Sequence, residues 1–134
     1  MKKVVIDTNV LVSALLFGGY PGKLITLCKE RHIQPLSSRE IIEEYLRVLV
    51  YPNFHLTEEE IGYLLSHEVL PWFEIIGVQT GKPYVVDDPS DDKFIWCAIQ
   101  VKAKAIISSD QHLLGLSSCP VPILSPLRFL GVMV

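Results

Sequence analysis

Four acidic side chains stand where a chemical site could form: Asp7, Glu44, Asp92 and Asp110. Asp7 follows an apolar run at residues 4–6, and Asp110 follows a second apolar run and two serines. Carboxylates that gather in one place repel one another, so the group costs stability unless a cation is bound. Oxygen ligands without paired cysteine or histidine favour hard ions such as Mg²⁺ or Mn²⁺. If the four acids converge, we expect a metal site of the kind that hydrolyses phosphodiester bonds.

Each of these acids also has an ordinary structural explanation. Asp7 and Asp110 could simply cap the helices that follow them, because aspartate is a favoured N-cap residue. Glu44 could be a surface residue with a buried stem. When the helix expected at residues 39–50 is drawn at 100° per residue, Glu44 borders its apolar face. Glu43 falls on the opposite side and is expected to pair with Arg47 four residues on. We therefore expect Glu44 to be the glutamate that reaches inward.

An acidic segment precedes the apolar helix predicted at residues 91–102. It contains Asp87, Asp88, Asp91 and Asp92. The helix dipole and capping account for one or two acids in a first turn, and four exceed that need. Ser90 is the expected N-cap, which leaves Asp91 and Asp92 free to point at a ligand. We expect Asp92 to be the site residue and Asp91 to support it.

Apolar runs and turn signals predict that strands and helices alternate along the chain. Strands are expected at residues 4–6, 32–36, 73–78, 105–108 and 121–124. Helices are expected at residues 9–16, from Pro21, at 39–50, after a capping box at Thr57 and Glu60, and at 91–102, 110–114 and 126–131. The alternation predicts an α/β fold whose parallel sheet has helices on both faces. If strands 1 and 4 are neighbours, Asp7 and Asp110 point into one crevice at the carboxyl edge of the sheet.

Length and composition narrow the class of protein. The 134 residues predict one domain, 1–134, and the 49% hydrophobic content predicts a globular chain. The net charge of −3 and pI of about 5.8 argue against a strongly basic nucleic-acid binder. A metal-dependent nuclease stays compatible with them, because bound ions change the local field. The three cysteines lack paired spacing, which favours reduced thiols and a cytoplasmic location. Asp7 interrupts the first apolar run, so no signal peptide is expected, and no apolar stretch reaches the ~20 residues of a membrane span.

Taken together, the motifs resemble those of PIN-domain ribonucleases. The opening motif covers residues 5–14, and later motifs at 43–49, 88–94 and 108–110 follow in the family's order. The chain is most similar to the group of toxin components of bacterial and archaeal toxin–antitoxin pairs. The resemblance implies a three-layer α/β/α sandwich with strand order 3-2-1-4-5 and metal-dependent cleavage of RNA. It also implies homodimers and a small antitoxin protein as partner.

The resemblance also assigns roles to positions in this sequence. Asp7, Glu44, Asp92 and Asp110 occupy the catalytic acidic positions and would bind Mg²⁺ or Mn²⁺. Thr8 or Asn9, together with Ser108 and Asp91, occupy supporting polar positions. His112 stands where the family often has a further acid. A neutral imidazole could bind a metal, orient a water or take no part, so one ion and two ions both stay open.

Two other functions compete with the nuclease. A phosphatase of the haloacid dehalogenase type would use Asp7 as a covalent nucleophile, but it needs a second aspartate where this chain has Asn9. A catalytically weak module could keep the fold and act by binding RNA or protein. The presence of all four acids argues against such a module.

Overall fold

The structure is a computed structural model that describes residues 1–133. Five parallel strands form one sheet in the order β3-β2-β1-β4-β5. Their bounds are Lys2–Ile6 for β1, Ile33–Ser37 for β2, Glu74–Ile75 for β3, Ala105–Ile107 for β4 and Ile123–Leu124 for β5. The order and direction confirm the α/β fold expected from the sequence. The two edge strands are shorter than predicted, and β3 is exposed at both of its residues.

The helices also follow the predicted order. They are α1 (Thr8–Leu16), α2 (Gly19–Lys29), α3 (Arg39–Leu49), α4 (Glu58–Tyr63), α5 (Asp92–Val101), α6 (Gln111–Leu114) and α7 (Pro126–Met133). The remaining helical segments are the 3-10 turn η1 (Pro52–Phe54), the π-helix η2 (Leu64–Val69) and the 3-10 turn η3 (Pro89–Asp91). The capping box at Thr57 and Glu60 is present. The expected cap at Ser90 is wrong: Asp88 caps η3 by accepting from the Ser90 backbone N–H, and α5 begins after this turn.

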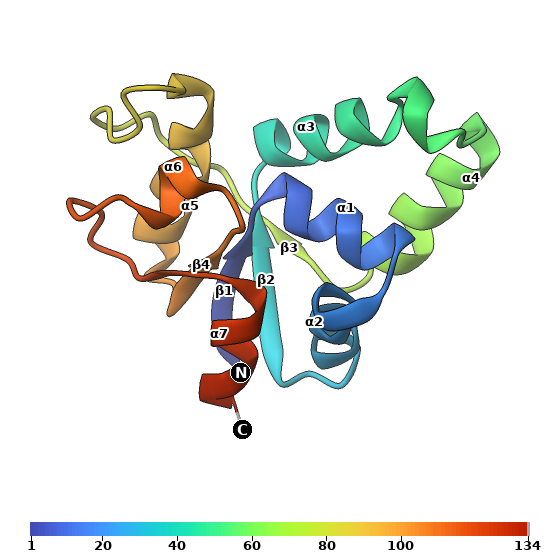
Figure 1. Ribbon diagram of the computed structural model, residues 1–134, viewed down its shortest axis with the longest axis horizontal. Coiled ribbons are helices and arrows are strands. Elements are labelled where there is room, and N and C mark those ends of the chain that lie inside the picture. Colours follow the sequence, from blue (N-terminus) through green and yellow to red (C-terminus); the bar gives the residue numbers. More distant parts are fainter. Residues whose placement is uncertain (134) are drawn as a thin grey trace.

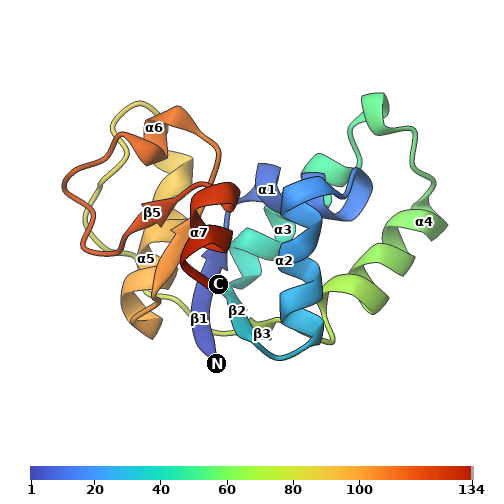
Figure 2. The same ribbon diagram turned by 60° about the horizontal axis from the view of Figure 1, so that its bottom comes forward.

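The sheet topology reverses between β1 and β4. The chain runs from β1 to β2 and β3 in one direction, then crosses to β4 and β5 on the other side of β1. Because parallel crossovers are right-handed, the connection from β1 to β2 and the reversed connection from β3 to β4 place α2 and α5 on opposite faces of the sheet. α2 and α7 pack together and on the strands, and α5 packs on β1, β2 and β4 (Figures 1 and 2). The point of reversal is where open α/β sheets bind ligands, and residues that follow β1 and β4 line it.

The core fixes the carboxyl end of β1. Val4, Val5 and Ile6 are at most 1% exposed, as expected for a strand covered on both faces. The buried Tyr45 of α3 donates its hydroxyl to the Ile6 carbonyl at 2.5 Å. This bond ties α3 to the end of β1. Glu44 therefore enters the site next to Asp7, which follows Ile6.

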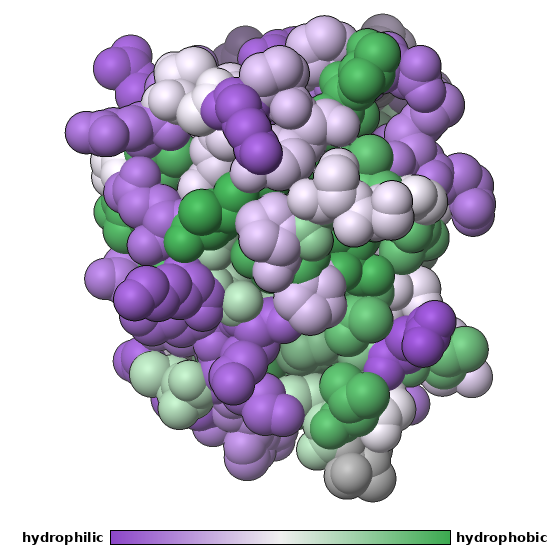
Figure 3. All heavy atoms as spheres, turned by 90° about the vertical axis from the view of Figure 1, so that its left-hand side faces the viewer, coloured by the Kyte–Doolittle hydropathy of each residue, from purple (hydrophilic) through white to green (hydrophobic). Residues whose placement is uncertain are grey.

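The surface mixes polar and apolar area. On the side of the molecule that Figure 3 shows, hydrophilic side chains alternate with smaller hydrophobic groups. Such mixing is ordinary, since apolar atoms supply more than half of a folded protein's surface. Among the described residues no single helix has the length and apolar composition to cross a membrane, although the bent pair α1 and α2 passes that test jointly.

Candidate active site

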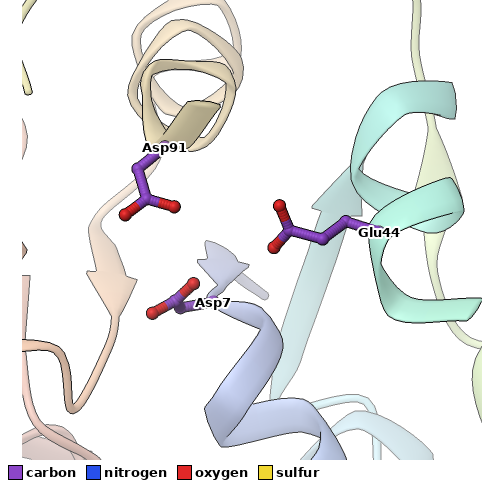
Figure 4. Close-up of side chains that lie close together, drawn as sticks. All are labelled: Asp7, Glu44 and Asp91. Carbon is purple, nitrogen blue, oxygen red and sulfur yellow. The ribbon is translucent and has the colours of Figure 1, made fainter. Parts of the chain in front are cut away.

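Three carboxylates converge at the point where the strand order reverses. Asp7, Glu44 and Asp91 each place a carboxylate oxygen within 4.8 Å of the others. Asp7 comes from the junction of β1 and α1, Glu44 from α3, and Asp91 from the turn η3 (Figure 4). The three side chains point toward one another from segments far apart in the sequence. The expected gathering of acids is therefore present with two differences: Asp91 takes the place of Asp92, and Asp110 lies outside the group of three.

Asp7 both caps a helix and faces the site. Its Oδ1 accepts from the Thr8 backbone N–H at 2.8 Å, which caps α1. Its Oδ2 accepts from the Ser108 hydroxyl at 2.7 Å, across the boundary between β1 and β4. Burial raises the pKa of Asp7, and the charges of Glu44 and Asp110 add to that effect, while the bonds from Ser108 and Thr8 oppose it. Asp7 thus caps α1 as expected, and its second carboxylate oxygen also binds Ser108 across the sheet.

Glu44 is held from both sides. The Thr8 hydroxyl donates to Oε2, and the Lys93 ammonium donates to Oε1 at 2.5 Å. The inward direction expected of Glu44 agrees with its side-chain exposure of 15%, against 52% for Glu43. The expected partner of Glu43 is wrong, because it pairs with Arg39 one turn before it.

Asp91 is a buried residue whose carboxylate has no protein partner within residues 1–133. It is 7% exposed, and within residues 1–133 its carboxylate forms no hydrogen bond or ion pair. No fully enclosed side-chain oxygen there lacks a partner, so the Asp91 oxygens stay open to solvent. Burial raises the pKa of Asp91 to about 7, with further contributions from the charges of Asp7, Asp88, Glu44 and Asp110. A buried acid beside two others is stable in its charged form only when positive charge is brought to it.

The expectation that Asp92 joins this group is corrected by the structure. Asp92 is 3% exposed, and its Oδ1 accepts from the backbone N–H groups of Tyr84 and Val85 at 2.9 and 2.8 Å. It anchors the segment before η3 onto α5. Successive residues of a helical turn point about 100° apart, so only one of two adjacent aspartates can face the other acids. With Ser90 as the N-cap, the sequence placed both aspartates in α5, whereas Asp91 belongs to the turn η3 and only Asp92 to α5.

Asp110 lies beside the three acids and also caps a helix. Its Oδ1 accepts from the His112 backbone N–H at 2.8 Å, and its own N–H donates to the Ser108 hydroxyl at 3.0 Å. It lies outside the group joined within 4.8 Å, yet its charge contributes to the raised pKa of Asp7 and of Asp91. Ser108 therefore links the ends of β1 and β4.

Of the other expected supporting residues, Thr8 contacts the acidic group, whereas Asn9 and His112 are exposed. Thr8 bonds to Glu44, whereas Asn9 is exposed and forms no side-chain hydrogen bond within the described chain. His112 is 60% exposed, and its Nδ1 lies 3.3 Å from Oδ2 of the exposed Asp87. Lys93 is a site contact that the sequence reading missed. The only signal for it was its place directly after two aspartates.

The donors at this site fit a hard divalent cation. Asp7, Glu44 and Asp91 offer carboxylate oxygens only, which suit Mg²⁺ or Mn²⁺ better than softer metals. The buried, unpartnered Asp91 carboxylate is the observation that a bound cation would explain.

Comparisons with known proteins bear on the family and the fold of the chain. A family model described as the PIN domain matches residues 3–112. An uncharacterised protein of Methanocaldococcus jannaschii, MJ1680, is 33% identical over an alignment of 123 residues that covers 85% of this chain and 74% of that protein. PAE2754 from Pyrobaculum aerophilum has a similar structure, with a TM-score of 0.65 at 13% identity over 98% of this chain and 95% of that one. FitAcB from Neisseria gonorrhoeae has a TM-score of 0.63 at 15% identity over 93% of this chain and 99% of that one. These two structures share the fold.

Proposed function

The chain belongs to the PIN-domain family, a family of nucleases, and we propose that it is a metal-dependent endoribonuclease that cleaves RNA phosphodiester bonds. The observation that carries the proposal is Asp91: the residue is 7% exposed, and its carboxylate has no protein partner within residues 1–133 and faces Asp7 and Glu44. A fold need not keep such a group for stability, because it raises the energy of the folded state when no cation is present.

Asp7, Glu44 and Asp91 would hold the ion. When bound, Mg²⁺ or Mn²⁺ supplies positive charge that polarises a phosphodiester and activates a water for attack. Asp110 adds negative charge at the edge of the group, where it strengthens the attraction for a cation. The acidic site on a chain of net charge −3 repels RNA, so a bound cation also makes the approach of the substrate favourable.

The other residues of the site keep these carboxylates in place. Ser108 and the Thr8 backbone hold Asp7, one oxygen each. The Thr8 hydroxyl holds Glu44. Fixed carboxylates lose little freedom when an ion or a water binds, and small displacements of such groups are costly for catalysis. Thr8 is thus a positioning residue for two of the three acids.

The biological setting is a second part of the proposal. From the resemblance to toxin components we propose that the chain acts in a toxin–antitoxin pair, as a homodimer in the cytoplasm, with a small antitoxin protein as partner. Three free cysteines suit that reducing compartment. The competing function is a PIN-fold module that binds RNA or protein without cleaving. The unpartnered Asp91 favours the enzyme over this module.

Cleavage of single-stranded RNA oligonucleotides tests the proposal. The wild-type protein should cleave with Mg²⁺ or Mn²⁺ and stop in EDTA. Asp7→Asn, purified in the same way, is the control for contaminating ribonucleases and should be inactive while melting normally. If wild type and Asp7→Asn cleave alike, or if wild type cleaves equally well in EDTA, the proposed function is wrong.

A further inference from the structure

Lys93 places its ammonium group against Glu44, one of the three carboxylates. The side chain is 16% exposed, and Nζ donates to Glu44 Oε1 at 2.5 Å and to the Ser90 carbonyl at 2.6 Å. Ser90 is the residue before Asp91, so one ammonium group touches α3 on one side and the turn η3 on the other. Lys93 therefore joins the two segments that supply Glu44 and Asp91.

This ion pair differs from the others in the described chain. The Arg39–Glu43 pair on α3 is 86% and 52% exposed, and the Lys29–Glu68 pair is 39% and 26% exposed. Exposed pairs contribute little to stability, because water screens them. The Lys93–Glu44 pair is 16% and 15% exposed, so screening is weaker and its charges matter more.

We propose that Lys93 is a built-in counter-ion of the carboxylate group, which holds Glu44 and the η3 turn together without metal and weakens the binding of a divalent ion. This inference deepens the proposed function and rests on it for the metal-binding half. Glu44 keeps a lone pair on each oxygen beyond those that receive Thr8 and Lys93, so it can bind an ion while Lys93 stays bonded. The bound ion and the ammonium group then repel each other across Glu44.

The counter-ion proposal predicts two effects of opposite sign. Removing the Lys93 charge should destabilise the metal-free protein, because Glu44 loses its ion-pair partner and the group of three acids loses that neighbouring positive charge. The same change should tighten metal binding, because the entering cation no longer meets an ammonium group. If Lys93 only oriented Glu44 for the metal, removing its charge should weaken metal binding instead. An ordinary surface pair predicts no change in either quantity.

The test uses thermal melting in EDTA and calorimetric titration with Mn²⁺ on the full chain. Lys93→Gln should lower the metal-free melting temperature by about 3–6 °C and bind Mn²⁺ at least about tenfold more tightly than wild type. Lys93→Arg keeps the charge and should return both values toward wild type. Arg39→Gln removes the exposed pair of the same helix and should leave both unchanged. Lys93→Gln combined with Glu44→Gln should recover metal-free stability, because the unbalanced charge is gone.

The outcomes separate this inference from the proposed function. If Lys93→Gln melts like wild type in EDTA, or binds Mn²⁺ more weakly, the counter-ion proposal is wrong even when wild type binds metal as a nuclease should. If wild type binds no Mn²⁺, the proposed function fails, and the metal-free melting of Lys93→Gln and the double variant decides the counter-ion role. Recovery by the double variant supports it, and a further loss of stability overturns it.

Discussion

The turn η3 and the first turn of α5 contain adjacent aspartates with different surroundings. Asp91 and Asp92 are both buried, at 7% and 3% exposed. Asp92 accepts two backbone N–H groups from residues 84 and 85, whereas Asp91 has no protein donor and faces Asp7 and Glu44. Burial alone therefore does not identify a site residue. The hydrogen-bond partners separate the two, because a buried carboxylate with two backbone donors is already satisfied by the fold, whereas one without protein donors has its oxygens available to a ligand or to water.

Substitution of Asp91 and of Asp92 should test most directly whether the two aspartates have different roles. Asp91→Asn should reduce RNA cleavage by about 100-fold or more, and the metal-free protein should melt at or above the wild-type temperature, since one repulsion is removed. Cleavage rates and melting curves in EDTA measure both effects. Near-normal turnover would remove Asp91 from the site.

Asp92→Ala should show the reverse pattern. It leaves the backbone N–H groups of Tyr84 and Val85 without their acceptor, which should cost about 2–4 kcal/mol of unfolding free energy. Cleavage per folded molecule should fall much less than in Asp91→Asn. Urea denaturation gives the stability, and assays well below the melting temperature give the activity. An Asp92→Ala variant that is stable but inactive would restore Asp92 as a site residue.

The stabilisation by added metal should differ between a variant that lacks a metal ligand and one that lacks only a helix cap. Free Mn²⁺ at 100 times its dissociation constant should stabilise wild type by ~2.7 kcal/mol. Asp91→Asn should gain the least from metal, because it loses a ligand. Asp110→Asn should be intermediate, since asparagine still caps α6 and only a nearby charge is lost. Melting in EDTA and in Mn²⁺ tests this order, and equal gains in all three proteins would contradict it.

Glu43 and Glu44 give a matched pair on α3. Glu44→Gln should lower cleavage by roughly tenfold or more, because the charge that faces the ion is removed. Glu43→Gln removes only an exposed pair with Arg39 and should stay near wild type. Single-turnover assays at fixed Mn²⁺ compare the two. A larger loss in Glu43→Gln would mean that the wrong face of α3 has been assigned to the site.

The metal-free stability should depend on pH through Asp91. Its pKa is raised from 3.8 to about 7 in the folded chain, so folding favours the protonated form. The resulting stability is full below the unfolded pKa near 3.8 and is lost as pH rises through about 7. In EDTA the melting temperature of wild type should therefore fall relative to that of Asp91→Asn between pH 4.5 and pH 8. A constant difference across this range would show that Asp91 titrates normally.

The smallest effect is expected at His112. Its pair with Asp87 is 60% and 73% exposed, and its ring lies outside the group of three acids. His112→Ala should shift the Mn²⁺ concentration for half-maximal activity by less than about threefold, as for an exposed pair. A shift of tenfold or more would indicate a ligand or a residue that supports one.

The sequence by itself determined the succession of strands and helices along the chain and two members of the acidic group, Asp7 and Glu44. Continuous apolar runs predicted buried parallel strands, and helix periodicity selected Glu44 over Glu43, because both signals are local. Tertiary structure decided the rest. The choice of Asp91 over Asp92 depends on a 3-10 turn and on backbone donors at residues 84 and 85. The choice of Thr8 over Asn9 and the contact of Lys93 depend on Glu44, which lies 36 and 49 residues away along the chain. Local patterns fix which face of an element is apolar, but a side chain's distant partner is set only when the elements pack.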